Sequence, residues 1–412
     1  MDRREFLIKL GLTTISTTVA LAGAEVTLRL ISSYEGEVNP FRHNPIIAAQ
    51  TSEEVFFPDS YLGHRLVPDY AYVFSSRYDS IRTRKDSAKV QELPYSLITK
   101  DRIQSIDEVT TGLDPAKPII LNIGDSSTSG WDSDAVTTAK EMRKIGRVNP
   151  ISLRGPFFQY LTYSDVLGES FQTINAGVPG YASLQGARYL ERLFEELSVR
   201  GIKPSYITIY FGNNDSVCNG NVEDKTVLPR NPFSSKLLAF LRTNTQGFTI
   251  VSRTSLDDYR CNLERMVNFA RASDVKPILI RPLIPKVWYP GLRASTKFDE
   301  LEGALEGVRN TRQGRLLLEA IDLYKEGLEE LKKDEIKAES LLVEAQNRDY
   351  MVPRIKPAYV EILKDVADKT NTSLIDVQTQ IPIDDRGYFI DYCHPIEPAN
   401  RIIAQAVVNE IE

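Results

Sequence analysis

Short apolar runs alternate with longer segments of helical periodicity from about residue 117 onwards, and this alternation constrains the fold more than any other feature. The runs are rich in β-branched and aromatic residues, which favours strands. Five such runs lie at residues 118–123, 171–175, 205–211, 276–280 and 373–377. Helical periodicity extends over about 183–199, 255–273, 313–347, 356–369 and 397–411. Because parallel strands are joined by helical crossovers, the sequence predicts an α/β fold: a mostly parallel five-stranded sheet with helices on both faces.

The composition agrees with a soluble globular protein and argues against several other classes. Of the 412 residues, 42% are hydrophobic and 26% are charged, which suffices for a buried core. The length allows two or three domains, or one large domain with insertions. A net charge of −6 and the lack of a compact basic block argue against a nucleic-acid partner. Only one segment, near the start, is long and uncharged enough to enter a bilayer, which excludes a polytopic membrane protein.

The first residues resemble a twin-arginine export signal. Arg3 and Arg4 precede an uncharged stretch, Leu10 to Ala24, that ends in an Ala-x-Ala cleavage pattern. As a helix this stretch would reach about 22 Å, less than the hydrocarbon core of about 30 Å. Two other interpretations stay open: an uncleaved anchor that continues to Leu30, and a buried amphipathic helix of a cytosolic protein. The first two of the three interpretations place the mature domain outside the cytoplasm, in the periplasm, at the cell surface or secreted.

Cysteine usage does not identify the compartment. The three cysteines, Cys218, Cys261 and Cys393, allow at most one intramolecular disulfide and leave one thiol over. No C-x-x-C motif is present, and three dispersed cysteines do not form a zinc site. The sequence therefore predicts neither a metal site nor a cofactor.

The loops that follow the predicted strands contain residues capable of ester chemistry. In open α/β sheets the active site lies beyond the carboxyl ends of the strands. Ser126, directly after the first strand, can present its hydroxyl and its own amide at that edge. After the second strand, residues 175–180 contain glycines that let a backbone amide approach a developing oxyanion. After the third strand, Asn214 can donate from its side chain into the same region.

A fourth loop, near the C-terminus, supplies a candidate base. Asp391 lies three residues before His394, so its carboxylate can reach Nδ1–H and leave Nε2 to take a proton from a serine. The two other histidines, His43 and His64, lie in the loop-rich N-terminal region, and neither has an acidic residue three positions before it. Each motif alone is more often a plain turn. What indicates an active site is their joint occurrence on predicted loops, three of which follow consecutive strands.

At these residues the sequence resembles the SGNH hydrolases, also called GDSL-like esterases or lipases. The residues that match the family's conserved blocks lie at 124–130, 175–180, 212–215 and 391–394. The resemblance implies a flavodoxin-like sandwich of three layers, αβα, and the cleavage of ester bonds.

The resemblance also implies a role for each matched residue. Ser126 would be the nucleophile and His394 the general base. The oxyanion hole would consist of the amides of Ser126 and Gly180 and the side chain of Asn214. The second block also aligns on Gly177, so both glycines are candidates for the second donor.

The stretch between the fourth and fifth strands is much longer than an ordinary crossover. Within it, at about 290–370, residues 315–327 and 337–345 resemble one tetratricopeptide-like helix pair. A single pair cannot form a solenoid, so it must dock on the main domain. Two interpretations stay open: a lid or partner surface over the site, and a solvated helical hairpin. Residues 287–289 and Arg354 either line this region or serve packing.

Similar insertions occur in membrane-tethered members of the family near exopolysaccharide systems, and residues 59–68 resemble the N-terminal extension of those members. The chain is therefore divided into an export signal or membrane anchor (1–31), a loop-rich extension (32–115) and a hydrolase domain (116–412).

The leading hypothesis is an exported serine esterase that cleaves short acyl esters, with carbohydrate O-acetyl groups as a plausible target. One alternative keeps the site but changes the acceptor, giving an O-acyltransferase that modifies an exopolysaccharide. A second alternative is a non-catalytic scaffold. The expected partners are a small-molecule or carbohydrate ester, a membrane through the N-terminus, and a protein at the helical insertion.

Overall fold

The computed structural model describes residues 56–59, 62–66, 96–98, 103–130, 161–217, 252–287, 312–349, 354–383, 385 and 387–412. The predicted export segment, residues 1–31, lies outside these ranges. No helix in the described ranges combines the length and the apolar character needed to cross a membrane.

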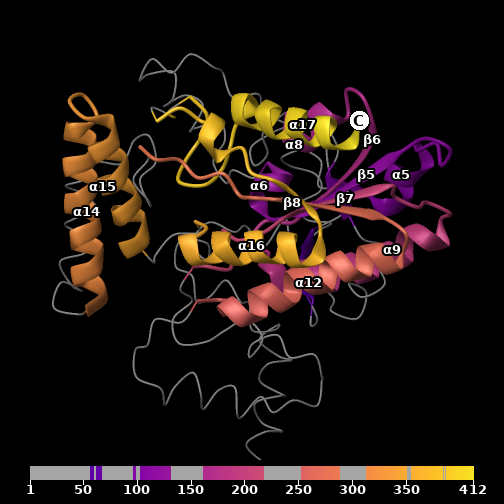
Figure 1. The fold of residues 1–412 in the computed structure, drawn as a ribbon. Coiled ribbons are helices and arrows are strands. Elements are labelled where there is room, and N and C mark those ends of the chain that lie inside the picture. Colours follow the sequence, from indigo (N-terminus) through magenta and orange to yellow (C-terminus); the bar gives the residue numbers. More distant parts are fainter. Residues whose placement is uncertain are drawn as a thin grey trace, which may run out of the picture.

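A sheet of seven strands, in the order β4-β3-β6-β5-β7-β8-β9, lies at the centre of the described part of the chain (Figure 1). The strands are β3 (Ser96–Ile98), β4 (Ile103–Ser105), β5 (Ile119–Gly124), β6 (Gln172–Gly177), β7 (Tyr206–Tyr210), β8 (Lys276–Ile280) and β9 (Ser373–Ile375). The five strands from β6 to β9 in this order are parallel. This confirms the predicted five-stranded parallel sheet.

The two remaining strands come from the segment predicted to be a loop-rich extension. Strand β3 pairs antiparallel with β4 on one side and with β6 on the other. Both strands are three residues long, too short to show an alternation in the sequence. A separate antiparallel pair is formed by β1 (Phe56–Asp59) and β2 (Gly63–Leu66), and Leu62 beside it is fully buried. Parts of this segment therefore pack with the main sheet, and its boundary near residue 116 stays a prediction.

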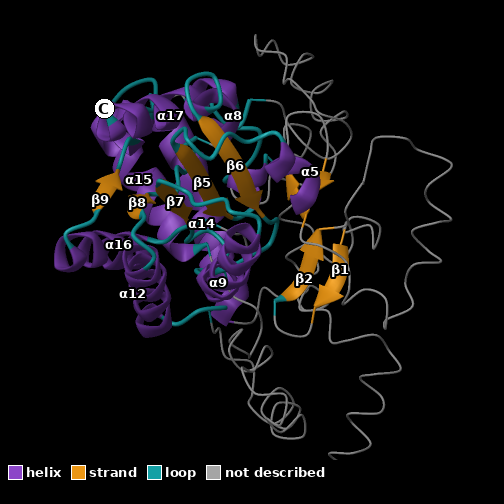
Figure 2. Ribbon diagram, turned by 90° about the vertical axis from the view of Figure 1, so that its right-hand side faces the viewer, coloured by secondary structure: helices purple, strands orange, loops and turns teal. Residues whose placement is uncertain are grey.

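Helices cover both faces of the sheet (Figure 2). The helices of one face are α9 (Ser183–Val199), α12 (Leu256–Ala272) and α16 (Pro357–Thr370). Those of the other face are α8 (Tyr163–Leu167) and α17 (Glu397–Ile411). The described residues also form two short helices, α5 (Ile106–Thr111) and α6 (Ser126–Ser129), and a 3₁₀ turn, η3 (Gln378–Gln380). The arrangement is the predicted three-layer αβα sandwich.

Each face of the sheet has its own hydrophobic core. Leu121 belongs to the cluster that contains Leu263 of α12 and Leu363 of α16. Its neighbour Ile120 belongs to the cluster that contains Ile403 of α17. Successive side chains of a strand point to opposite faces, so a strand buried on both faces is apolar without alternation. This is why the central strands appear in the sequence as short continuous apolar runs.

The insertion between β8 and β9 contains two helices, α14 (Arg312–Glu330) and α15 (Glu335–Arg348), that form a hairpin beside the sandwich (Figure 1). Asp334 caps the second helix by accepting a hydrogen bond from the amide of Lys337 at 3.0 Å. The two helices share a small core that also includes Val287, from the loop after β8. The hairpin therefore packs against the edge of the sheet where the parallel strands end.

Candidate active site

Ser126 lies at the start of a tight turn that the local sequence builds directly after β5. Asp125 caps α6 by accepting a hydrogen bond from the amide of Ser127 at 2.8 Å, and Gly130 ends the helix with a positive φ of 73°. Ser126 is the first residue of α6, so its amide has no acceptor within the helix. The serine hydroxyl and its own amide are thus presented together at the end of the strand.

Glycines at the ends of β5 and β6 let α6 lie close to the sheet. A Cβ on Gly124 would come within 2.0 Å of Oγ1 of Thr128, and a Cβ on Gly177 within 2.5 Å of the amide nitrogen of Ser129. Any side chain at either position would push α6 away. The position of Ser126 therefore depends on two residues without side chains.

The imidazole of His394 lies within hydrogen-bond distance of the Ser126 hydroxyl, although 268 positions separate the two residues. Nε2 of His394 is 2.8 Å from Oγ of Ser126. On the other side of the ring, Nδ1 is 2.9 and 2.8 Å from the two carboxylate oxygens of Asp391. The serine, the histidine and the aspartate are all buried, with 8%, 8% and 4% of their surfaces exposed. The structure thus brings the three predicted residues into one hydrogen-bonded row.

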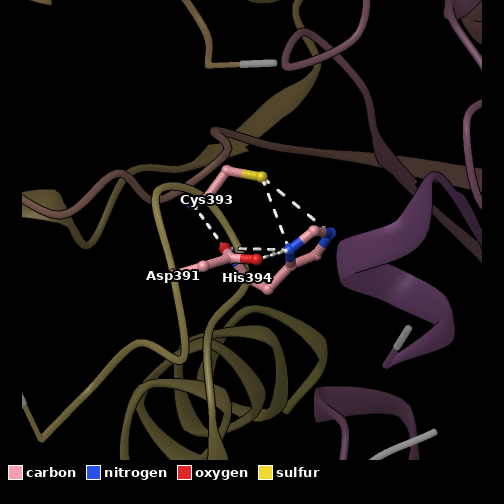
Figure 3. Close-up of side chains that lie close together, drawn as sticks. All are labelled: Asp391, Cys393 and His394. Carbon is pink, nitrogen blue, oxygen red and sulfur yellow. Dashed lines mark hydrogen bonds and ion pairs between the residues drawn. The ribbon is translucent and has the colours of Figure 1, made fainter. Parts of the chain in front are cut away.

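The turn from Asp391 to His394 holds its own carboxylate in place (Figure 3). Oδ1 of Asp391 accepts hydrogen bonds from the amides of Cys393 and His394, both at 3.0 Å. The amide of Ile390 donates to the carbonyl of His394 at 3.0 Å and closes the base of the turn. The geometry that pairs the carboxylate with the imidazole is therefore produced by a spacing of three residues.

The electrostatic surroundings favour a protonated imidazole. Burial lowers the pKa of His394, but the neighbouring Asp391 carboxylate and Cys393 raise it, and the net result lies well above the ordinary value of 6.5. The Cys393 thiol is 3.7 Å from Nδ1 and 3.9 Å from Nε2. Burial raises the pKa of this thiol to about 11, so the thiol is neutral at physiological pH. Asp391 is thus the group that stabilises an imidazolium in this site.

A second buried carboxylate lies next to the serine. Burial raises the pKa of Asp125 to about 7, against the hydrogen bond from the Ser127 amide and the attraction of His394, which lower it. The side-chain amide of Asn214 donates to this carboxylate at 3.4 Å. Asp125 therefore links the turn that carries Ser126 to the loop after β7.

The predicted oxyanion donors lie on three loops that meet at this edge. The side-chain amide of Asn214 donates to Asp125, the residue before Ser126, and to the carbonyl of Tyr181, the residue after Gly180, at 3.0 Å. Asn214 is thus hydrogen-bonded to the immediate neighbours of both other predicted donors. Gly180 has a positive φ of 81°, which turns the backbone sharply at this point.

The alternative donor, Gly177, is engaged elsewhere. Its amide donates to the side-chain oxygen of Asn175 at 3.0 Å, and Gly177 is the last residue of β6. An amide held in a hydrogen bond to a side chain of its own strand is less available to a substrate oxygen. This favours Gly180 over Gly177.

Three residues without a predicted role support these loops. Arg253 is buried, and its guanidinium donates to the carbonyl of Gly180 at 2.9 Å. Asp215 accepts hydrogen bonds from the amide and the hydroxyl of Ser183 at 2.9 and 2.6 Å, at the start of α9. Asn213 accepts from the amide of Ile355 at 3.0 Å. Only Asp215 carried a sequence signal, as the last letter of its block.

The described residues contain one group of side chains that could hold a metal ion. Asp391, Cys393 and His394 place their ligand atoms within 4.8 Å of one another. Both nitrogens of His394 already have protein partners, Asp391 and Ser126. A cation could bind this imidazole only by displacing one of them, so this donor set fits a metal site poorly. Cys261 and Cys393 are free thiols, and Cys218 lies outside the described residues.

Residues 123–402 match the model of the GDSL-like lipase/acylhydrolase family. The chain belongs to this family. The matched range includes the serine, histidine and aspartate described above, and membership makes the GDSL-like protein a hydrolase that acts on ester bonds. The family resemblance expected from the sequence blocks is thereby confirmed.

Solved structures with a similar arrangement include a GDSL-like lipase from Bacteroides thetaiotaomicron, 13% identical, with a TM-score of 0.35 over 74% of this chain and 94% of the other. Another is a catalytic mutant of an acetylxylan esterase from Geobacillus stearothermophilus, 17% identical, with a TM-score of 0.32 over 73% of this chain and 95% of the other. No curated protein sequence matches the chain significantly.

Proposed function

We propose that this GDSL-like hydrolase cleaves short acyl esters through a Ser126–His394–Asp391 triad. The observation that carries the proposal is the row of contacts in which Nε2 of His394 is 2.8 Å from Oγ of Ser126 while Nδ1 contacts Asp391. This is the arrangement that nucleophilic catalysis by a serine requires. With Nδ1–H bonded to the carboxylate, Nε2 is the acceptor for the serine proton.

In the proposed reaction, Oγ of Ser126 attacks the ester carbonyl carbon while Nε2 of His394 takes the hydroxyl proton. His394 then gives this proton to the departing alcohol, leaving the acyl group on Ser126. Water attacks the acyl-enzyme with His394 again as the base, which releases the acid and restores the serine. Asp391 orients the imidazole and stabilises its cation in both halves of the reaction.

The oxyanion formed in each half-reaction is assigned to three donors: the amides of Ser126 and Gly180 and the side chain of Asn214. The hydrogen bonds from Asn214 to the neighbours of both other donors support this assignment. A substrate oxygen would take the place of one of these internal acceptors. Loss of one such donor typically costs about 10²–10³ in turnover.

The proposed substrate is a carbohydrate O-acyl ester with a short acyl group. The low exposure of the residues Ser126 and His394, 8% each, supports a small acyl group. The similarity of the helical insertion to those of membrane-tethered members near exopolysaccharide systems supports a carbohydrate alcohol. A protein partner at the hairpin is proposed on the same resemblance.

An O-acyltransferase uses the same acyl-enzyme and differs only in its acceptor. Release of acetate from an acetylated sugar in water supports hydrolysis, whereas acyl transfer that requires an added polysaccharide acceptor supports transfer. Product analysis with and without the glycan separates the two.

The triad is tested with a fluorophosphonate probe, which labels only an activated serine. We expect Ser126→Ala to abolish labelling and turnover of 4-nitrophenyl acetate. Ser198→Ala, at an exposed serine of α9, is the matched control and should change neither. Undiminished labelling of Ser126→Ala would refute the nucleophile assignment. Relative rates on acetylated sugars and on longer acyl esters then test the substrate class.

We also propose export of the chain through its N-terminal segment, as periplasmic, cell-surface or secreted protein, with a membrane tether if the segment is not cleaved. The adjacent arginines Arg3 and Arg4 and the uncharged stretch after them support this. Cell fractionation of the wild type and of the variant with both arginines changed to lysine tests it. Retention of the variant in the cytoplasm supports a twin-arginine signal, and unchanged export contradicts it.

A further inference from the structure

One buried arginine connects the helical hairpin with the loop that holds the histidine. Arg354 is fully buried in the segment between α15 and α16. Its Nη1 donates to the hydroxyl of Tyr324 in α14 at 2.5 Å, and its Nε donates to the carbonyl of Tyr392 at 3.1 Å. Tyr392 lies directly after Asp391. One guanidinium thus contacts both the insertion and the catalytic turn.

The backbone of the same segment holds the loop after β7. The carbonyl of Arg354 accepts a hydrogen bond from the hydroxyl of Ser216, and the amide of Ile355 donates to the side-chain oxygen of Asn213 at 3.0 Å. Ser216 and Asn213 lie on either side of the Asn214–Asp215 pair. The segment therefore contacts the loop that carries the proposed oxyanion donor as well as the loop that carries the base.

A second set of hydrogen bonds connects this segment to the turn that carries His394. The side-chain amide of Asn213 donates to Oγ of Ser127 at 3.5 Å, and Ser127 donates to the carbonyl of Cys393 at 3.2 Å. Ser127 directly follows the proposed nucleophile. The contacts from Arg354 to Tyr392 and from Asn213 through Ser127 to Cys393 reach adjacent carbonyls of the same turn. Together these hydrogen bonds connect the loops that carry Ser127, Asn213 and Cys393 to one another.

The chemistry of these groups favours a fixed geometry. A buried guanidinium is costly unless its donors are satisfied, so movement of either acceptor is opposed. Burial raises the pKa of Tyr324 to about 12, so its hydroxyl stays neutral and can accept from Arg354. The planar fork of arginine also holds the Tyr324 hydroxyl and the Tyr392 carbonyl in a defined relative position, which a lysine cannot do.

We propose that Arg354 is a positioning residue that couples the α14–α15 hairpin to the turn carrying His394. The inference rests on the proposed function, because it assigns Arg354 an effect on the Ser126–His394 contact. Loss of the Tyr324 hydroxyl, the hairpin group that contacts Arg354, then lowers the rate of acylation of Ser126 without changing the binding of a small ester. The hairpin is accordingly part of the catalytic framework.

The test uses Tyr324→Phe in the full chain, which removes one acceptor of Arg354 and keeps the ring that packs in the hairpin core. The rates measured are fluorophosphonate labelling and turnover of 4-nitrophenyl acetate. A displacement of about 1 Å at the reacting groups can cost about 10²-fold. For the loosening of one contact we expect kcat and the labelling rate to fall about tenfold, with KM changed less than about twofold.

Glu339→Gln is the matched control. It removes an ion pair between the hairpin and the loop after β8, in which Nζ of Lys286 is 2.6 Å from the Glu339 carboxylate, and leaves Arg354 untouched. We expect wild-type kcat for this variant. Arg354→Lys should lower kcat at least as much as Tyr324→Phe, and the double variant should be no slower than Arg354→Lys alone, because both changes break the same coupling.

A purely structural role predicts a different result. If Tyr324→Phe lowers the Tm but leaves kcat and the labelling rate at wild-type values, the coupling is refuted. Additive losses in the double variant also contradict it. Failure of the wild type itself to be labelled would instead overturn the proposed triad, so the two ideas fail on different measurements.

Discussion

The helical hairpin uses charged residues in the opposite way to the edge of the sheet at which Ser126 and His394 meet. At the edge, Asp391 and His394 are buried and contact each other at 2.8 Å. On the hairpin, the ion pairs lie at the surface, as between Arg348 and Glu344, whose side chains are 36% and 47% exposed. Water screens the attraction within an exposed ion pair and can replace a lost partner. A buried charged group that loses its partner has no water to replace it, so the loss is costly. Polar contacts therefore determine geometry at the edge and contribute little on the hairpin surface.

Asp391→Asn is expected to have the largest effect. The amide cannot stabilise the imidazolium and disfavours the tautomer in which Nδ1 carries the proton. Equivalent changes in serine hydrolases lower kcat by about 10⁴. Steady-state turnover of 4-nitrophenyl acetate measures the loss, with near-UV circular dichroism to check folding. A loss of less than tenfold would contradict the role of Asp391.

Asn214→Ala is expected to lower kcat by about 10²–10³, because it removes one of the proposed oxyanion donors. Because this donor acts on the oxyanion and not on the bound ester, the loss should appear in kcat with KM changed less than about twofold. An unchanged kcat in Asn214→Ala would contradict the proposed role of Asn214 as an oxyanion donor.

The pH dependence of labelling is expected to report His394. Below its pKa the imidazole is protonated and cannot take the Ser126 proton, so the rate rises with pH through that pKa. Asp391 and Cys393 raise the pKa of His394 above 6.5 in spite of burial. The midpoint of the rise in labelling rate should therefore lie above pH 6.5. Asp125, the residue before Ser126, has a pKa raised by burial to about 7 and would titrate in a similar range. If Asp125→Asn labels with the same pH midpoint as the wild type, the midpoint belongs to His394. If the midpoint is lost in this variant, it belongs to Asp125.

The smallest effect is expected on the hairpin surface. Glu344→Gln removes an exposed ion pair with Arg348, and we expect the Tm to fall by less than about 2 °C because water screens exposed pairs. Thermal unfolding and kcat, measured beside Tyr324→Phe, check this. A large loss of activity at Glu344 would show that the surface of the hairpin, and not only its buried contact with Arg354, matters to catalysis.

The sequence was sufficient to predict the architecture and to place the candidate site residues on loops that meet at one edge of the sheet. Continuous apolar runs identify strands buried on both faces, and the carboxyl ends of parallel strands necessarily share one edge. Ser126 and Asn214 follow two of these strands directly. Asp391 and His394 are three residues apart, so their contact is local. These features depend on spacing along the chain, which the sequence contains.

The supporting contacts required the tertiary structure. Arg354 and Tyr392 are 38 positions apart, and Ser127 and Cys393 are 266 apart. Strand β3 is three residues long and gains its place only by pairing with β6. A buried arginine or asparagine has no periodicity that marks it in the sequence.

The sequence by itself therefore determined the layered α/β fold, the family and the loops on which the reactive residues lie, because local patterns and strand ends set these. Only the tertiary structure decided that Nε2 of His394 reaches Ser126 and that Arg354 joins the hairpin to the histidine turn. The physical reason is that these contacts depend on packing between segments distant in the chain. A polar group buried by that packing is costly unless it forms a hydrogen bond, so its partner is set by the packing.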